Sequence, residues 1–281
     1  MKNITIVIPC KNDPLITRCV ASIDDQYPIL IVFNGSPESF VLQTKKALKN
    51  KTSVSFIELQ KPNLSWALEM GTRQSKTNFV LYMDSDCIFE VGALDAFFKA
   101  AAKGNSSKEV YKGEVVFEPG RDFIENMISK SRKHHTAEVL TAYKPPLMIS
   151  KEIVKKTGGY AFDKRLIWRE DSDLDNRIRL AKIKIISVPE GIIHHKSIDL
   201  KTDLRSTFRY GIGLAIADHL NIILTEVPRS AMSTFKSQGL LPAVYMLFRN
   251  RIYDMGYIHT RVRIVFGLHK FDHSLTAEHH V

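Results

Sequence analysis

The stretch Phe79-Val80-Leu81-Tyr82-Met83-Asp84-Ser85-Asp86 joins an apolar run to two carboxylates that are one residue apart. A continuous apolar run is typical of a buried parallel strand, and ligands bind at the carboxyl ends of such strands. In extended backbone Asp84 and Asp86 point to the same side, where two hard oxygen ligands suit Mg²⁺ or Mn²⁺ and leave room for phosphates. The alternative is an Asp/Ser turn in which Asp86 caps the next helix.

The composition is that of a globular protein with a sizeable core. The chain has 281 residues, 44% hydrophobic and 25% charged, which is ordinary for a soluble domain. The net charge of +10 favours anionic partners, among them nucleotides, polyanions and anionic lipid headgroups. No nucleic-acid motif stands out, so we expect no nucleic-acid partner.

The cysteines and the N-terminal residues favour a cytoplasmic protein. Cys10, Cys19 and Cys87 form neither a disulfide framework nor a metal-ligand pattern, so we interpret them as reduced thiols. The N-terminus is too short and wrongly built for a signal peptide. No apolar run reaches the roughly 18–20 residues that span a bilayer. We expect a cytoplasmic protein, with peripheral contact at the inner face of the membrane as a further option.

Strand-like and helix-like segments alternate along the first part of the chain. Strands are predicted at residues 4–8, 29–33, 54–59 and 79–83, with helices at 14–22 and 64–74 and another beginning at Pro37 after a Ser36 cap. This order predicts an α/β fold with a doubly wound, mainly parallel sheet.

The second half of the chain continues this pattern and then changes. Helices are predicted at 91–103, 121–140 and 171–181, and strands at 115–117, 147–149 and 183–188, the last ended by Pro189. Beyond residue 200 aromatic and basic residues follow helical spacing. We therefore expect an α/β domain over 1–200 and a helical C-terminal extension over 201–281, the latter for acceptor, membrane-surface or oligomer contacts.

A second acidic cluster, Trp168-Arg169-Glu170-Asp171-Ser172-Asp173, precedes a predicted helix. Asp171 is three residues ahead of Leu174 and so shares that helix's buried side. The helix N-terminus stabilises an ionised carboxylate, which is then ready to accept a proton from a hydroxyl. The alternative is simple capping of the helix by Asp171 or Asp173.

Two adjacent histidines, His194 and His195, follow the turn after the predicted strand 183–188. An imidazole beside a divalent cation is a plausible third ligand, but the sequence does not say which histidine would supply it. The alternative is a surface or core histidine pair, and no zinc-type spacing accompanies them.

Together with the opening strand, these clusters resemble the family 2 glycosyltransferases of the GT-A fold. The resemblance runs from residue 4 to about residue 196 and rests on segments 6–13, 31–36, 84–86, 158–163, 170–174 with Arg177, and 189–194. Each motif is short, but their order and spacing match the family. One departure is that Phe33 and Asn34 stand where the family usually has two aspartates, which leaves the identity of the base open.

The resemblance implies a role for each matching residue. Asp86, assisted by Asp84, would hold Mn²⁺ or Mg²⁺ on the donor diphosphate, with His194 as a candidate metal or diphosphate contact. Asp171 would be the catalytic base of an inverting transfer. The implied nucleotide-binding residues are Pro9, Lys11, Asn12, Asp13, Asn34, Arg73, Asp84 and Ser85. The implied acceptor residues are Trp168, Arg169 and Glu170.

Two of these assignments keep an alternative. Arg73 stands where the family's phosphate-binding arginine is missing, and it is equally typical of a solvated helix arginine. Trp168 fits the face of a sugar ring but also fits a protein core.

We expect the protein to transfer a sugar from a nucleotide-diphosphate sugar to a hydroxyl of a carbohydrate or lipid-linked acceptor. The donor that we expect is a UDP-sugar. The resemblance implies a setting in bacterial surface polysaccharide or glycolipid synthesis. One alternative is a sugar-nucleotide nucleotidyltransferase, which would need a glycine-rich phosphate loop that residues 9–13 lack. Another is an inactive basic module that binds membranes or polyanions.

The C-terminal extension has two interpretations. A basic, aromatic and amphipathic helix over residues 240–268 would lie in a membrane interface. The same helices would otherwise pack on the main domain or on a second subunit, giving a homo-oligomer.

Overall fold

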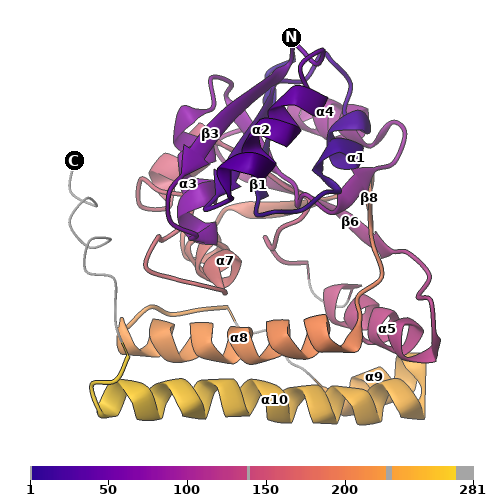
Figure 1. Cartoon of the computed structure of the whole chain (residues 1–281), viewed down its shortest axis with the longest axis vertical. Helices are drawn as coiled ribbons and strands as arrows, with labels where there is room; N and C mark the ends of the chain where they lie inside the picture. Colours follow the sequence, from indigo (N-terminus) through magenta and orange to yellow (C-terminus); the bar gives the residue numbers. More distant parts are fainter. Residues whose placement is uncertain (1, 138–139, 226–229, 270–281) are drawn as a thin grey trace.

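The protein is an α/β body that rests on a layer of long helices (Figure 1). The computed structural model describes residues 2–137, 140–225 and 230–269. The strands are β1 (Ile4–Cys10), β2 (Ile29–Asn34), β3 (Val54–Leu59), β4 (Phe79–Tyr82), β5 (Cys87–Phe89), β6 (Glu109–Phe117), β7 (Leu147–Ser150) and β8 (Lys184–His195). The helices are α1 (Ile16–Ala21), α2 (Glu38–Ala47), α3 (Leu64–Gln74), α4 (Ala93–Lys103), α5 (Phe123–Ala137), α6 (Lys151–Lys156), α7 (Glu170–Leu180), α8 (Leu200–His219), α9 (Ala231–Gln238) and α10 (Leu240–Val265).

All eight strands form one sheet in the order β3-β2-β1-β4-β7-β6-β8-β5. The β1–β2, β2–β3, β1–β4 and β6–β8 pairs are parallel, and the β4–β7, β6–β7 and β5–β8 pairs are antiparallel. The mainly parallel α/β fold with a helical C-terminal extension is therefore confirmed.

Both faces of the sheet are covered, which explains the continuous apolar runs. Every residue of β1 is buried. Ile6 and Ile8 pack in a cluster with residues of α1, α2 and α4, whereas Val7 between them packs with residues of α3, α6 and α7. Because successive side chains of a strand point to opposite faces, a strand covered on both sides must be apolar at every position.

Strand β8 is longer than the sequence predicts. Pro189 does not end it, because β8 continues to His195 and pairs with β6 on both sides of an irregularity. The pairing jumps from Ser187 opposite Lys112 to Ile192 opposite Glu114, so the proline lies where no ladder hydrogen bond is needed. The missing amide hydrogen of Pro189 therefore costs the strand nothing.

One alternative is excluded and one local prediction was wrong. Asp86 does not cap a helix, because the element after it is strand β5, which pairs with β8. Ser36 does not cap α2, whose N-cap is Pro37 without a side-chain hydrogen bond. The Ser36 hydroxyl instead donates to the carbonyl of Cys10 at 3.3 Å, which ties the end of β1 to the loop after β2.

The helical layer is built on α8 and α10, which lie side by side (Figure 1). Glycines allow the close approach: a Cβ on Gly211 would lie 2.1 Å from the carbonyl oxygen of Tyr253, and one on Gly256 would lie 2.0 Å from that of Phe208. Helix α5, from the middle of the chain, also joins this layer, since Ile128 packs with Ile198 and Tyr245. The layer therefore contains more than the C-terminal extension.

Candidate active site

A cavity of about 790 Å³ is lined by loops that follow β1, β2 and β4 and by residues of α8 and α10. Asp84, Asp86 and Asp171 all line it. The two acidic motifs are 85 residues apart between Asp86 and Asp171 in the sequence, yet they share one cavity. The carboxyl edge of the parallel strands is where such a cavity is expected in an α/β sheet.

The turn after β4 places the first pair of carboxylates. The amide of Cys87 donates to the carbonyl of Asp84 at 3.2 Å, which closes a tight turn between β4 and β5. Asp86 faces two basic side chains, with its Oδ1 3.7 Å from His195 Nε2 and its Oδ2 3.3 Å from Lys196 Nζ. Asp84 Oδ1 lies 3.7 Å from the ammonium of Lys144.

A cation site fits this corner of the cavity. Ligand atoms of Asp86, Cys87 and His195 lie within 4.8 Å of one another. Burial raises the pKa of the Cys87 thiol, so this sulfur stays protonated and is a poor ligand. The remaining donors, the Asp86 carboxylate and the His195 imidazole, suit Mn²⁺ or Mg²⁺.

The two histidines have different surroundings. They are consecutive on β8 and point to opposite faces of the strand. His195 lines the cavity, whereas His194 does not and instead lies 3.0 Å from Glu90 Oε2. The structure therefore places His195, and not His194, beside Asp86.

The second acidic cluster begins α7 from an unusual turn. Trp168 and Arg169 both have positive φ, 68° and 85°, a conformation that costs non-glycine residues free energy and persists only where the surroundings hold it. Arg169 is held by hydrogen bonds to Ser172 Oγ at 2.9 Å and Tyr253 Oη at 2.8 Å. These contacts fix the start of α7, where Asp171 faces the cavity.

The electrostatic setting of Asp171 differs from that of Asp86. Desolvation, and then the neighbouring carboxylate of Glu170, raise the pKa of Asp171 to about 6, against the opposing effects of Lys144 and Arg169. A carboxyl group with this pKa is a stronger base than an ordinary aspartate and is still largely ionised at neutral pH.

Lys144 and Lys112 are site residues that sequence reasoning missed. Lys144 is nearly buried and lies 3.3 Å from Glu170 Oε1 as well as 3.7 Å from Asp84, so it links the two acidic clusters. Burial lowers the pKa of Lys112 to about 7, and its ammonium donates to the carbonyl of Pro145 at 2.7 Å. Their only signal in the sequence is their position beside Gly113 and Pro145-Pro146, residue types that interrupt strands and helices.

The predicted nucleotide residues divide into two groups. Those that line the cavity are Pro9, Lys11, Asp13, Asn34, Asp84 and Ser85. Asn12 and Arg73 do not line it; the Arg73 guanidinium donates to Glu69 at 2.7 Å and lies over the Trp66 ring. Among the predicted acceptor residues, Trp168, Arg169 and Glu170 all line the cavity.

Ser85 and Asn34, which line the cavity, also form hydrogen bonds that connect neighbouring loops. The Ser85 hydroxyl donates to Asp13 Oδ2 at 2.8 Å, which joins the loop after β1 to the turn after β4. Asn34 Oδ1 accepts from the amide of Asn63 at 2.6 Å. Asn34 therefore anchors the start of α3 from the cavity rim.

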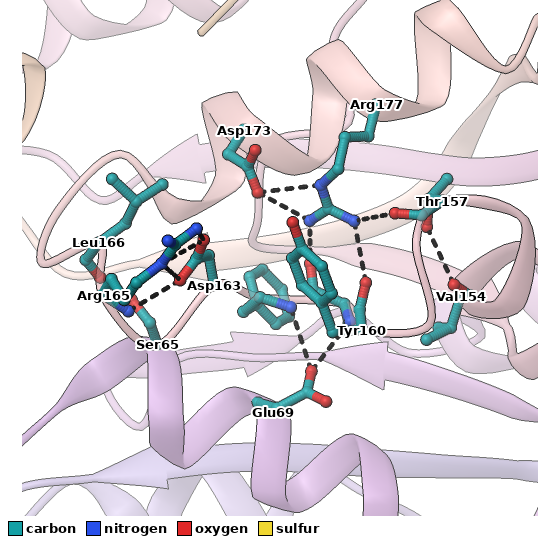
Figure 2. A network of polar contacts seen from close by, with 12 residues as sticks. Ser65, Glu69, Val154, Thr157, Tyr160, Asp163, Arg165, Leu166, Asp173 and Arg177 are labelled. Atoms are coloured by element: carbon teal, nitrogen blue, oxygen red, sulfur yellow. Dashed lines mark hydrogen bonds and ion pairs between the residues drawn. The ribbon is translucent and has the colours of Figure 1, made fainter. Parts of the chain in front are cut away.

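A buried polar network supports the loop that leads to Asp171 (Figure 2). Arg177 pairs with Asp173 at 2.8 Å and donates to the carbonyls of Thr157 and Tyr160 at 2.6 and 2.9 Å. Glu69 of α3 accepts from the amides of Ala161 and Phe162 at 2.9 and 3.1 Å. Arg177 and Glu69 are thus positioning residues that tie residues 157–162 to α7 and α3.

This arrangement agrees with the comparison to known families. The model of glycosyl transferase family 2 matches residues 5–158. The chain belongs to this family. A family 2 glycosyltransferase uses a nucleotide sugar as donor, and the matched region contains Asp84, Asp86 and the loops after β1 and β2. No curated protein matches the sequence significantly.

Solved structures show the same fold. The mannosyltransferase PcManGT from Pyrobaculum calidifontis, in complex with GDP-Man and Mn²⁺, aligns with a TM-score of 0.62 and 15% identity, covering 95% of this chain and 88% of that one. TarS 1-349 from S. aureus, in complex with UDP-GlcNAc, aligns with a TM-score of 0.55 and 14% identity, covering 95% and 92%. At these identities the likeness shows the fold alone. Within residues 2–137, 140–225 and 230–269, no helix is both long and apolar enough to cross a bilayer.

Proposed function

We propose that this family 2 glycosyltransferase is an inverting enzyme in which Asp171 is the catalytic base. The observation that carries the proposal is that Asp86 and Asp171 line one cavity. The attacking hydroxyl oxygen forms a bond to the anomeric carbon as the bond to the donor diphosphate breaks, and the hydroxyl proton passes to Asp171. This displacement needs no covalent intermediate and only one base, unlike the carboxylate pair of a glycosidase.

Asp84, Asp86 and His195 are the residues that would hold a divalent cation, Mn²⁺ or Mg²⁺. A cation bound there would neutralise charge on the departing diphosphate. Lys196, 3.3 Å from Asp86, would add a further positive charge beside the diphosphate. The structurally similar mannosyltransferase was solved in complex with GDP-Man and Mn²⁺, which supports metal dependence.

For the donor we propose a UDP-sugar. Structural relatives were solved with both kinds of nucleotide sugar, one with UDP-GlcNAc and another with GDP-Man. Lys11, Asp13 and Asn34 line the end of the cavity that the base and ribose would occupy. A thermal-shift screen of UDP, GDP and other nucleotides with Mn²⁺ tests this proposal. UDP should raise the Tm most, and a larger shift with GDP would identify the donor as a GDP-sugar instead.

The decisive experiment for the function is release of the nucleoside diphosphate from a panel of nucleotide sugars. Turnover that requires a divalent cation would support the proposal. Metal-dependent nucleotide binding without turnover on any donor and acceptor would favour the inactive binding module. The setting in surface polysaccharide or glycolipid synthesis, and the cytoplasmic location, stay predictions.

The outer side of α10 supports peripheral contact with an anionic membrane. Exposed apolar side chains recur along it at Leu240, Val244, Leu247, Phe248, Met255, Ile258 and Val262. Helices α9 and α10 together carry five basic residues and one acidic residue, Asp254. An apolar helix face with a positive charge excess matches an anionic lipid surface.

Vesicle sedimentation tests this contact. The full chain should bind vesicles that contain anionic lipid and bind neutral vesicles less, and Phe248→Glu should abolish binding. Absence of binding together with a dimer by light scattering would assign the same face to a homo-oligomer instead.

A further inference from the structure

The wall of the cavity opposite the strand ends is positively charged and rich in hydroxyl groups. Helices α8 and α10 contribute Thr202, Ser206, Thr207, Arg209, Tyr210 and Arg249 to it. None of these described lining residues of α8 and α10 is acidic, and nearby Asp199 is engaged as the N-cap of α8. The mechanism proposed above uses none of them.

Arg249 is the central residue of this wall. Only 8% of it is exposed, although it lines the cavity. Its Nε lies 2.8 Å from Asp203 Oδ2 and donates to Thr207 Oγ1 at 3.2 Å. Across the ranges that the structure describes, the two terminal nitrogens of Arg249 make no hydrogen bond. A nearly buried guanidinium group thus keeps its bidentate end for a ligand.

One buried carboxylate, Asp203, contacts two guanidinium groups beneath this wall. Asp203 is fully buried, and it is shared between Arg132, at 2.6 Å, and Arg249, while also accepting from the Tyr245 hydroxyl at 2.6 Å. Burying a guanidinium is costly unless it is paired and fully hydrogen-bonded. A bound anion would supply the partner that the terminal nitrogens of Arg249 lack.

Arg209 adds a second cation to the wall. Its guanidinium lies 4.8 Å from the centre of the Trp168 ring, and within the described residues it makes no ion pair. Trp168 belongs to the turn that presents Asp171, so Arg209 connects the basic wall with the acceptor side of the cavity.

We propose that Arg249 and Arg209 bind a phosphate group of the acceptor, with Thr207 and Ser206 as hydroxyl donors. Guanidinium forks and hydroxyl groups match the many oxygens of a tetrahedral phosphate. The inference rests on the proposed function, and it specifies that function: the acceptor is a phosphorylated molecule. The phosphate belongs either to a soluble sugar phosphate or to a lipid.

The first test compares acceptors. Transfer by the full chain is measured with matched acceptors that carry or lack a phosphate, and with a lipid phosphate in vesicles against a soluble sugar phosphate. The phosphorylated form should have the lower KM, and the lipid and soluble arms identify its source. Equal KM values with and without the phosphate would overturn the proposal.

The second test removes the cations. Arg249→Gln and Arg209→Gln should each raise the KM of the phosphorylated acceptor by about ten- to a hundredfold, as expected for a charge-assisted hydrogen bond, while the nucleotide Kd with Mn²⁺ changes less than about twofold. Arg249→Lys should recover part of the loss. Arg251→Gln is the matched control with the soluble acceptor, because Arg251 is exposed on the same helix, pairs with Asp254 and does not line the cavity. Weaker nucleotide binding in Arg249→Gln would assign this wall to the donor and so contradict the inference.

A third measurement does not depend on the stability of the Arg249 variants. Inorganic phosphate should compete with the acceptor but not with the donor in the wild-type protein, and Arg209→Gln should weaken this inhibition. Phosphate that competes only with the donor would contradict the inference. Absence of nucleotide binding and turnover under all conditions would instead refute the proposed function, so the two failures are distinguishable.

Discussion

The turn after β4 and the turn before α7 both present aspartates to one cavity, but their surroundings are opposite. Asp86 faces His195 and Lys196, whereas Asp171 follows another carboxylate, Glu170, and has a raised pKa. The first setting stabilises negative charge and suits a cation and its diphosphate. The second makes a carboxylate more basic. The same type of side chain is thus suited to two different roles because the neighbouring charges differ.

The largest effect should come from Asp171→Asn. The amide cannot accept the hydroxyl proton, so kcat should fall by about 10²- to 10⁴-fold while nucleotide affinity stays unchanged. Steady-state kinetics and calorimetry with the nucleotide and Mn²⁺ separate these effects. Turnover near the wild-type level would show that Asp171 is not the base. The proposed difference in role between the turn after β4 and the turn before α7 would then be wrong.

Asp86→Ala should weaken the binding of the nucleotide in the presence of Mn²⁺. The loss of one carboxylate from the cation site should reduce nucleotide affinity in the presence of Mn²⁺ by about ten- to a hundredfold, and little in its absence. Calorimetry with and without Mn²⁺ measures the difference. An affinity that is the same under both conditions, in the wild type as well as the variant, would count against a cation at this turn.

The histidine pair offers a matched comparison on one strand. His195→Ala should weaken Mn²⁺ binding by about tenfold, because its imidazole lies beside Asp86. His194→Ala should leave it unchanged, since that ring contacts Glu90 outside the cavity. Manganese titration of the two variants decides between them, and the reverse order would transfer the ligand role to His194.

The smallest effect concerns pH. With a pKa of about 6, Asp171 is protonated and inactive as a base below that pH, so kcat/KM should rise about tenfold per pH unit below 6 and level off above it. Lys144 lowers this pKa, so Lys144→Met should move the rise to higher pH. If kcat/KM did not change between pH 5 and 7 in either protein, the activity would not depend on the ionisation of Asp171.

Much of the α/β body was predictable because its signals are local. The runs that became β1, β2 and β4 are apolar at nearly every position, and β3 mixes apolar with polar residues. These runs end in polar or turn residues, so their type and order follow from the sequence. The same is true of Asp84, Asp86 and Asp171, each placed directly after a strand or at a helix start. The extent of β8 was not predictable, because Pro189 is accommodated by a pairing irregularity against β6.

The sequence by itself therefore determined the mainly parallel sheet and the acids that its strands and helices present, since apolar runs and their ends record local structure. Only the tertiary structure decided that His195 faces Asp86, that Lys144 joins the two acidic clusters and that Arg249 lines the same cavity. These contacts join residues that are far apart in the chain, and a long-range contact between charged side chains leaves no periodic pattern in the sequence.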